Sequence, residues 1–194
     1  LDAGETLDFD GNNMTSPLTI NSGAGADSLD GGTDADVIYG NGGIDQINGQ
    51  ENSAVYGADA LYGGAGNDVI TVDVESEFSN SSTTALVTDT VDGGAGTDTI
   101  NVFNDSGFGL PSTRGTGDSV TLALDIYHTN IENITVVDSA DDENAGDVTV
   151  SIAAAFTGTA LTIDGSSLDQ NPLSTNAEIL TVSQNTADTA ALTV

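Results

Sequence analysis

A nine-residue repeat is the feature that most limits how this chain can fold. Seven copies can be written between residues 22 and 101: SGAGADSLD, GGTDADVIY, GNGGIDQIN, AVYGADALY, GGAGNDVIT, TALVTDTVD and GGAGTDTIN. Position six is aspartate in every copy, and position eight is a large aliphatic residue in every copy. A five-residue insertion, 49–53, precedes the fourth copy. Tandem repeats of this kind indicate a chain that stacks coil upon coil.

The repeat predicts a short turn followed by a very short strand. Glycine recurs at positions two and four, where it permits positive φ and close approach of neighbouring backbones. The last three residues form the strand, and the aliphatic residue at position eight points inward. Since one such strand buries little surface, the copies must stack and share a core. Two copies then form one coil of a flattened parallel β-solenoid, so the expected fold class is all-β.

Stacking also places the position-six carboxylates one above another, about one strand spacing or roughly 4.8 Å apart. The net charge is −30 and Arg114 is the only basic residue, so the fold needs something to neutralise it. Composition alone fits a salt-adapted acidic surface equally well, but the repeated position of the aspartates favours bound cations. Carboxylate and carbonyl oxygens in a flexible turn suit Ca²⁺ better than Mg²⁺. Zinc and copper are disfavoured because the chain has no cysteine and one histidine, His128.

The charge balance and the residue types exclude several other functions. Nucleic-acid binding and attraction to anionic lipid both need a basic face, which one arginine cannot provide. No apolar run approaches the roughly 20 residues of a membrane span, so we expect no membrane insertion. An enzyme without cysteine or lysine would depend on paired carboxylates, and the repeat already accounts for most of the aspartate pairs. We therefore expect no catalytic activity.

These residues resemble the haemolysin-type calcium-binding repeats of the RTX family, with the nonapeptide G-G-x-G-x-D-x-U-x. The match is complete in GGAGNDVIT and GGAGTDTIN and looser in the other copies. The resemblance implies a right-handed parallel β-roll with Ca²⁺ ions between its turns. It also implies a bacterial protein exported by type I secretion, which folds outside the cell when it meets calcium.

Carried over residue by residue, the resemblance implies that Asp27 stacks with Asp45, and Asp45 with Asp68, on one edge of the roll. Asp36 is expected to stack with Asp59 on the other edge, and Asp98 to belong to a second short roll. The expected ligands are the carboxylates of Asp27, Asp34, Asp36, Asp45, Asp59, Asp68 and Asp98, and the carbonyls of Gly23, Gly25, Gly32, Gly43, Gly64, Gly66, Gly94 and Gly96.

Three further aspartates are candidate ligands on less regular ground. Asp89 lies in the copy without glycines, TALVTDTVD, which is expected to keep the strand. Asp73 lies in the alternating segment VDVESEF, where a solvated strand face explains the acids as well as a metal site does. Asp118 follows a glycine-rich loop, in GTGDSVTL.

The rest of the chain is typical of β-structure. Apolar–threonine–apolar triplets such as Ile134-Thr135-Val136 favour strands, and their spacing fits a broad solenoid or a β-sandwich. We expect a solenoid continuous with the roll. The expected organisation is leading strands in 1–21, the RTX roll in 22–71, strands with a second short RTX segment in 72–103, a loop in 104–119 and solenoid-like strands in 120–194.

The end of the chain also begins to repeat its start, since residues 192–194 match residues 18–20 at an offset of 174. We interpret the chain as one period of a tandem array within a larger protein. The expected function is a calcium-stabilised structural module of a secreted bacterial surface-layer, matrix or adhesin protein. The alternatives are the calcium-dependent secretion module of an exported hydrolase or toxin, and an adhesin segment that binds a ligand. The expected partners are Ca²⁺ ions and copies of the chain or neighbouring tandem modules.

Overall fold

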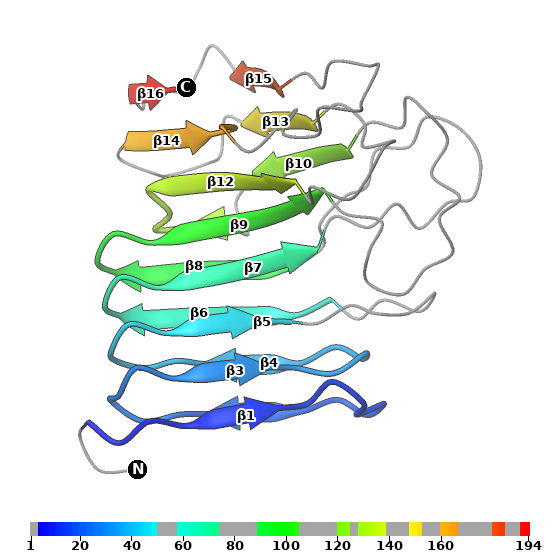
Figure 1. Ribbon diagram of the computed structural model, residues 1–194, viewed down its shortest axis with the longest axis vertical. Helices are drawn as coiled ribbons and strands as arrows, with labels where there is room; N and C mark the ends of the chain where they lie inside the picture. Colours follow the sequence, from blue (N-terminus) through cyan, green and yellow to red (C-terminus); the bar gives the residue numbers. More distant parts are fainter. Residues whose placement is uncertain are drawn as a thin grey trace.

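Parallel β-structure accounts for all the regular structure that the computed structural model describes. The described residues are 4–49, 58–73, 89–104, 120–124, 128–138, 148–152, 160–166, 180–184 and 191–194. Within them every strand pairing is parallel, and the strands form three sheets. Figure 1 shows the coils stacked along the long axis, from the N-terminal strand at one end to the C-terminal strands at the other. The predicted fold class, an all-β parallel roll that continues into a solenoid, is confirmed.

The largest sheet has eight strands and extends over the whole stack (Figure 1). Its order is β1-β3-β5-β7-β9-β12-β14-β16. The bounds are β1 Asp8–Asp10, β3 Ser28–Asp30, β5 Gln46–Asn48, β7 Val69–Asp73, β9 Thr99–Asn104, β12 Asn133–Asp138, β14 Ala160–Asp164 and β16 Ala191–Thr193.

The other two sheets contain the strands that alternate with these along the chain. A five-stranded sheet has the order β11-β8-β6-β4-β2, and a three-stranded sheet has the order β10-β13-β15. Because the chain passes from one sheet to another between successive strands up to β10, two strands make one coil in the repeat region. The bounds are β2 Thr19–Asn21, β4 Val37–Tyr39, β6 Ala60–Ala65, β8 Thr90–Ala95, β11 His128–Thr129, β10 Val120–Leu124, β13 Val148–Ile152 and β15 Leu180–Gln184.

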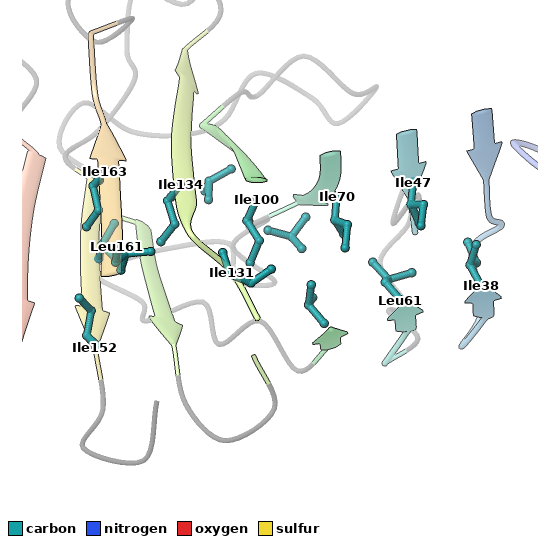
Figure 2. Packing of buried hydrophobic residues seen from close by; sticks show 14 of the residues in the cluster. Ile38, Ile47, Leu61, Ile70, Ile100, Ile131, Ile134, Ile152, Leu161 and Ile163 are labelled. Atoms are coloured by element: carbon teal, nitrogen blue, oxygen red, sulfur yellow. The ribbon is translucent and has the colours of Figure 1, made fainter. Parts of the chain in front are cut away.

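The core is a double column of the position-eight aliphatic residues. In the eight-stranded sheet Leu29 pairs with Ile47, which pairs in turn with Ile70 and then with Ile100. In the five-stranded sheet the matching column is Ile20, Ile38, Leu61 and Val91. These side chains are buried, and Figure 2 shows the two columns facing one another between the sheets. Each three-residue strand therefore contributes one inward side chain, and stacking assembles the core that no single strand could form.

The column continues above the nine-residue repeats. Ile134 in β12 lies in register with Ile100 below it and Ile163 above it. Leu161 and Ile152 are also buried in the same cluster. The plain β-texture beyond residue 119 thus continues the same core, as expected. No helix in the described part of the chain is long and apolar enough to cross a membrane.

The expectation of a second short roll around Asp98 is wrong. Strand β9 pairs with β7 from Val69 and Thr99 to Asp73 and Phe103, and β8 pairs with β6. The parallel ladder requires only that position eight of one copy meets position eight of the copy below. Ile70 and Ile100 meet that requirement across the intervening chain, so the repeat at 93–101 extends the first roll.

Candidate functional site

The position-six aspartates are buried where each turn enters its strand. All seven are at most 5% exposed, and Asp45 and Asp98 are completely buried. Burying an ionised carboxylate is costly unless hydrogen bonds or counter-charges compensate it. The arrangement of the two oxygens of each carboxylate therefore decides what this site can do.

One oxygen of each carboxylate takes part in a hydrogen-bond ladder along the first edge of the roll. The backbone N–H of Asp27 donates to Oδ1 of Asp45 at 2.8 Å, and the N–H of Asp45 donates to Oδ1 of Asp68 at 2.9 Å. The N–H of Asp68 donates in the same way to Oδ1 of Asp98 at 2.8 Å. The ladder starts at the N–H of Leu7, which donates to Asp27. The aspartates stack in the order that the nine-residue period predicts.

The second edge carries an equivalent ladder. The N–H of Leu18 donates to Oδ1 of Asp36 at 2.7 Å, and the N–H of Asp36 donates to Oδ1 of Asp59 at 2.8 Å. The N–H of Asp59 donates to Oδ1 of Asp89 at 2.9 Å. Asp89, from the copy without glycines, thus occupies the same place in its coil as the other aspartates.

The second oxygen of most of these carboxylates has no partner within the described protein. Oδ2 of Asp45, Asp59, Asp68 and Asp98 is buried and makes no hydrogen bond. At the lower end of the stack, by contrast, Oδ2 of Asp27 accepts the N–H of Gly23 at 3.3 Å. A buried polar atom without a partner destabilises a fold by about 1–3 kcal/mol, and by more when it is charged. The row of Oδ2 atoms is therefore suited to a ligand that the chain itself does not supply.

Each of these Oδ2 atoms faces a glycine at position one of its own turn. A Cβ atom on Gly40 would collide with Oδ2 of Asp45 and would lie 2.6 Å from the carbonyl oxygen of Gly63, one coil further on. A Cβ atom on Gly63 would likewise collide with Oδ2 of Asp68 and lie 2.6 Å from the carbonyl oxygen of Gly93. Carboxylate and carbonyl oxygens thus converge beside the position-one glycines Gly31, Gly40, Gly63 and Gly93. The sequence prediction gave roles to the glycines at positions two and four only. The signal for position one was present in the sequence, since glycine occupies it in four copies, at Gly31, Gly40, Gly63 and Gly93.

Gly49 corrects the placement of the insertion. A Cβ atom on Gly49 would collide with Oδ2 of Asp59, so Gly49 occupies position one of the fourth copy. Position one and position six are five residues apart in Gly40 and Asp45, but ten apart in Gly49 and Asp59. The insertion therefore falls between Gly49 and Asp59 in the sequence, and the copy begins at Gly49 rather than at residue 54.

The glycines at position four stack with almost no space between them. A Cβ atom on Gly66 would overlap the carbonyl oxygen of Gly43, and a Cβ atom on Gly96 would overlap that of Gly66. Gly43 and Gly66 also have φ of 127° and 147°, a region that L side chains rarely adopt. Only glycine allows this approach, in which the carbonyl of one turn faces the turn of the next coil. The carbonyl of Gly25 faces Gly43 in the same way.

The remaining predicted ligands are placed as follows. The carbonyl of Gly64 faces Gly94, while that of Gly23 accepts the N–H of Gly42 at 3.3 Å. Gly32, in the turn of the second edge, donates its N–H to Oδ2 of Asp36.

Two of the predicted acidic residues take no part in the two ladders, and a third lies outside the described residues. Asp34 is half-buried in the turn that leads to Asp36 and takes no part in the aspartate ladder. Asp73 ends β7, at the opposite end of that strand from Asp68. Asp118 lies outside the described residues. The metal-binding role of every predicted ligand stays a prediction.

Burial makes the metal-free ladder difficult to ionise. It raises the pKa of Asp45 to about 6, with the charges of Asp68 and Asp27 adding to the effect. Burial likewise raises the pKa of Asp59 to about 8 and that of Asp89 to about 6. At the lower end, burial also acts to raise the pKa of Asp27, but hydrogen bonds from Ser22, Leu7 and Gly23 outweigh it and lower that pKa. The carboxylates in the middle of the stack therefore lack compensation for their charge.

The ladder provides one carboxylate per coil at each edge. Among the described residues no three Asp, Glu, His or Cys side chains cluster as a ready-made metal site. A cation between two coils would thus meet two carboxylates and would take its other ligands from backbone carbonyl oxygens. A set of hard oxygen donors of this kind suits Ca²⁺, which accepts six to eight of them in flexible geometry.

Fold and site together define a class of protein: a parallel β-roll with buried, stacked aspartates beside glycine carbonyls at its edges. Comparison with protein families identifies that class. The RTX calcium-binding nonapeptide repeat matches in four copies, over residues 19–49, 54–73 and 88–102. The chain therefore contains an RTX repeat region, as the sequence indicated, and this region is a calcium-binding structural module. No curated protein and no solved structure gives a significant match to the chain.

Proposed function

We propose that Ca²⁺ ions bind between successive turns and hold the coils of the roll together. The observation that carries the proposal is the row of buried, unpartnered Oδ2 atoms at Asp45, Asp59, Asp68 and Asp98. The carbonyls of Gly63 and Gly93 converge on this row and complete a set of oxygen donors. Each ion would neutralise charge that burial makes costly and would join two coils at the same time.

The expected size of the effect makes calcium decisive for folding. Five gaps lie between stacked aspartates, three on the first edge and two on the second. At tenfold excess over its dissociation constant, an ion stabilises the fold by roughly 1.4 kcal/mol. Five ions together contribute roughly 7 kcal/mol, comparable to the whole stability of a small domain. We therefore propose that the chain is largely unfolded without calcium and folded with it.

Far-UV circular dichroism with matched metal additions tests this proposal. The full chain is dialysed against a chelator and then titrated with CaCl₂, and in parallel with MgCl₂ at the same ionic strength. We expect a cooperative gain of β-signal with calcium only. A spectrum that stays unchanged after complete chelation would refute calcium-dependent folding, and an equal response to magnesium would refute the selectivity.

We further propose that the module belongs to a secreted bacterial surface protein, of the surface-layer, matrix or adhesin type. RTX repeats occur in secreted bacterial proteins, and the acidic chain would meet millimolar calcium outside the cell. In this setting the roll is a non-catalytic spacer that calcium stiffens and that contacts neighbouring modules or copies of itself. The proposed boundaries are those given above, with the repeat at 93–101 now included in the first roll.

Cell fractionation separates this role from that of a secretion module on an exported hydrolase or toxin. An antibody against the chain should label intact cells of the source organism grown in calcium, and a chelator wash should release the antigen. Antigen found only in the culture medium, together with an enzymatic activity, would favour the alternative. Antigen confined to the cytoplasm would contradict both.

A further inference from the structure

The upper end of the first ladder closes on a glutamate that lies outside the matched repeats. The N–H of Asp98 donates to Oε2 of Glu132 at 2.9 Å. One coil below, the N–H of Asp68 makes the same bond to Oδ1 of Asp98 at 2.8 Å. Glu132 therefore takes the place in its coil that aspartate takes at position six of every repeat.

The turn that carries Glu132 is shorter than a repeat turn. A Cβ atom on Gly93 would collide with the carbonyl oxygen of Asn130, just as a Cβ atom on Gly63 approaches that of Gly93. Asn130 thus stands at position one, and only Ile131 separates it from Glu132. The longer side chain of glutamate compensates for the three missing residues of the turn.

The backbone of this short turn is held in the conformation it needs. Asn130 has a φ of 55°, in the left-handed region that asparagine tolerates better than most residues. Its side-chain Nδ2 donates to Oδ1 of Asp92 at 2.7 Å, in strand β8 of the coil below. This bond orients the turn so that the Asn130 carbonyl faces Gly93.

Three oxygen donors converge at this point. Oδ2 of Asp98 is completely buried and makes no hydrogen bond, and it lies 2.8 Å from the position that a Cβ on Gly93 would take. The carbonyl of Asn130 faces that same position, and the carboxylate of Glu132 lies against the backbone of Asp98. A hydrogen-bonding cap would need only Oε2 of Glu132 and would leave Oδ2 of Asp98 without a partner.

We propose that Asp98, the Asn130 carbonyl and Glu132 form one more calcium site, beyond the nonapeptide repeats. The site rests on the proposed binding of calcium between the repeat turns and extends that binding to a turn with no repeat motif. It makes the uppermost repeat coil continuous with the solenoid above, because β12 follows Glu132 directly and pairs with both β9 and β14.

An ion count in the full chain tests this site. Native mass spectrometry of the calcium-loaded protein is compared between wild type and Glu132→Gln. Glutamine keeps an oxygen that can accept the Asp98 N–H but removes the charge, so a purely structural cap would survive the change. We expect Glu132→Gln to bind one ion fewer than wild type. The control is Asp164→Asn, an exposed carboxylate in β14, which should keep the full count.

Each outcome discriminates between the proposals. Equal counts in wild type and Glu132→Gln overturn the extra site alone, whereas a wild type that binds no calcium overturns the proposed function. If Glu132→Gln does not fold, Glu132→Asp decides, since it keeps the charge and shortens the reach by one methylene. Loss of one ion in Glu132→Asp supports the site, and a full count overturns it.

Discussion

Replacing Asp59 by asparagine should change stability in opposite directions with and without calcium. Asp59 is 2% exposed, its Oδ1 accepts the N–H of Asp36, and its Oδ2 has no partner. Asparagine has nearly the same shape and keeps an oxygen for the Asp36 N–H. The substitution therefore removes the charge of the carboxylate and leaves the ladder in place.

The magnitude without metal follows from the pKa of Asp59. Burial, with the charges of Asp89 and Asp36 adding to it, raises this pKa from 3.8 to about 8. At pH 7 the unfolded chain is ionised at this residue, whereas the metal-free fold binds a proton there. That difference destabilises the metal-free fold by about 4 kcal/mol. Asparagine carries no charge and therefore avoids this destabilisation. Part of the benefit is offset, because the buried N–H groups of its amide lack acceptors, at a cost of about 1–3 kcal/mol. We expect Asp59→Asn to stabilise the metal-free fold by about 1–3 kcal/mol.

With calcium the sign should reverse, because Asp59 contributes to two gaps of the second edge. At hundredfold excess of calcium, loss of both ions removes about 5 kcal/mol. This loss exceeds the gain of about 1–3 kcal/mol in the metal-free fold, so we expect a net loss of about 2–4 kcal/mol. Urea unfolding followed by circular dichroism measures both effects, in chelator and in CaCl₂, with sucrose added to favour the metal-free fold. The matched control is Asp8→Asn, an exposed aspartate in β1, for which we expect less than about 0.5 kcal/mol in either buffer. A loss of stability of the same size in both buffers would show that the Asp59 charge has no special relation to calcium.

Three further predictions follow from the same geometry. In chelator, the fold should gain stability as the pH falls from about 8 towards 4, because the raised pKa values of Asp45 and Asp59 favour the protonated folded state. Circular dichroism at each pH measures the free energy of unfolding, and a stability that rises with pH would contradict the prediction. Gly40→Ala should abolish calcium-induced folding or destabilise the calcium-bound fold by more than about 2 kcal/mol, because its Cβ would clash with Oδ2 of Asp45. Gly42→Ala in the same turn is the control and should be tolerated, since its Cβ would meet only ordinary contacts at 3.8 Å or more. Ile100→Ala should cost about 2–5 kcal/mol in calcium, measured by urea unfolding, because Ile100 is completely buried between the sheets.

The sequence was sufficient to predict the coil, the register and the aspartate stack. All three follow from one rule, that position eight of each copy must meet position eight of the equivalent copy one coil further on, and Leu29, Ile47 and Ile70 obey it. The same rule leads past the glycine-free copy, where Asp89 and Val91 keep their places without the motif. Periodicity is informative here because stacking translates sequence spacing directly into position in space.

Features that depend on backbone proximity between distant coils could not be predicted. Gly49 takes position one ten residues before Asp59, and only the contact between them reveals where the insertion belongs. Glu132 completes the ladder from a three-residue turn that has no glycine, so no repeat search finds it. In both cases the chain reaches an equivalent place in space through a different number of residues.

The two oxygens of each position-six carboxylate have different surroundings, since Oδ1 accepts the ladder hydrogen bond and Oδ2 is left unpartnered in four of the copies. This difference bears on why position six carries aspartate. The ladder bond requires only an acceptor at Oδ1, such as the one that Asp98 offers to the Asp68 N–H, and asparagine would supply one without charge. Asparagine does serve as an acceptor nearby, where Asn67 Oδ1 takes the N–H of Thr97 at 3.0 Å. Yet all seven copies carry aspartate, with an oxygen that is left unpartnered in four of them. Burial raises the pKa of Asp45, Asp59 and Asp89, so their charge destabilises the metal-free roll, and the calcium ions proposed above would compensate that charge.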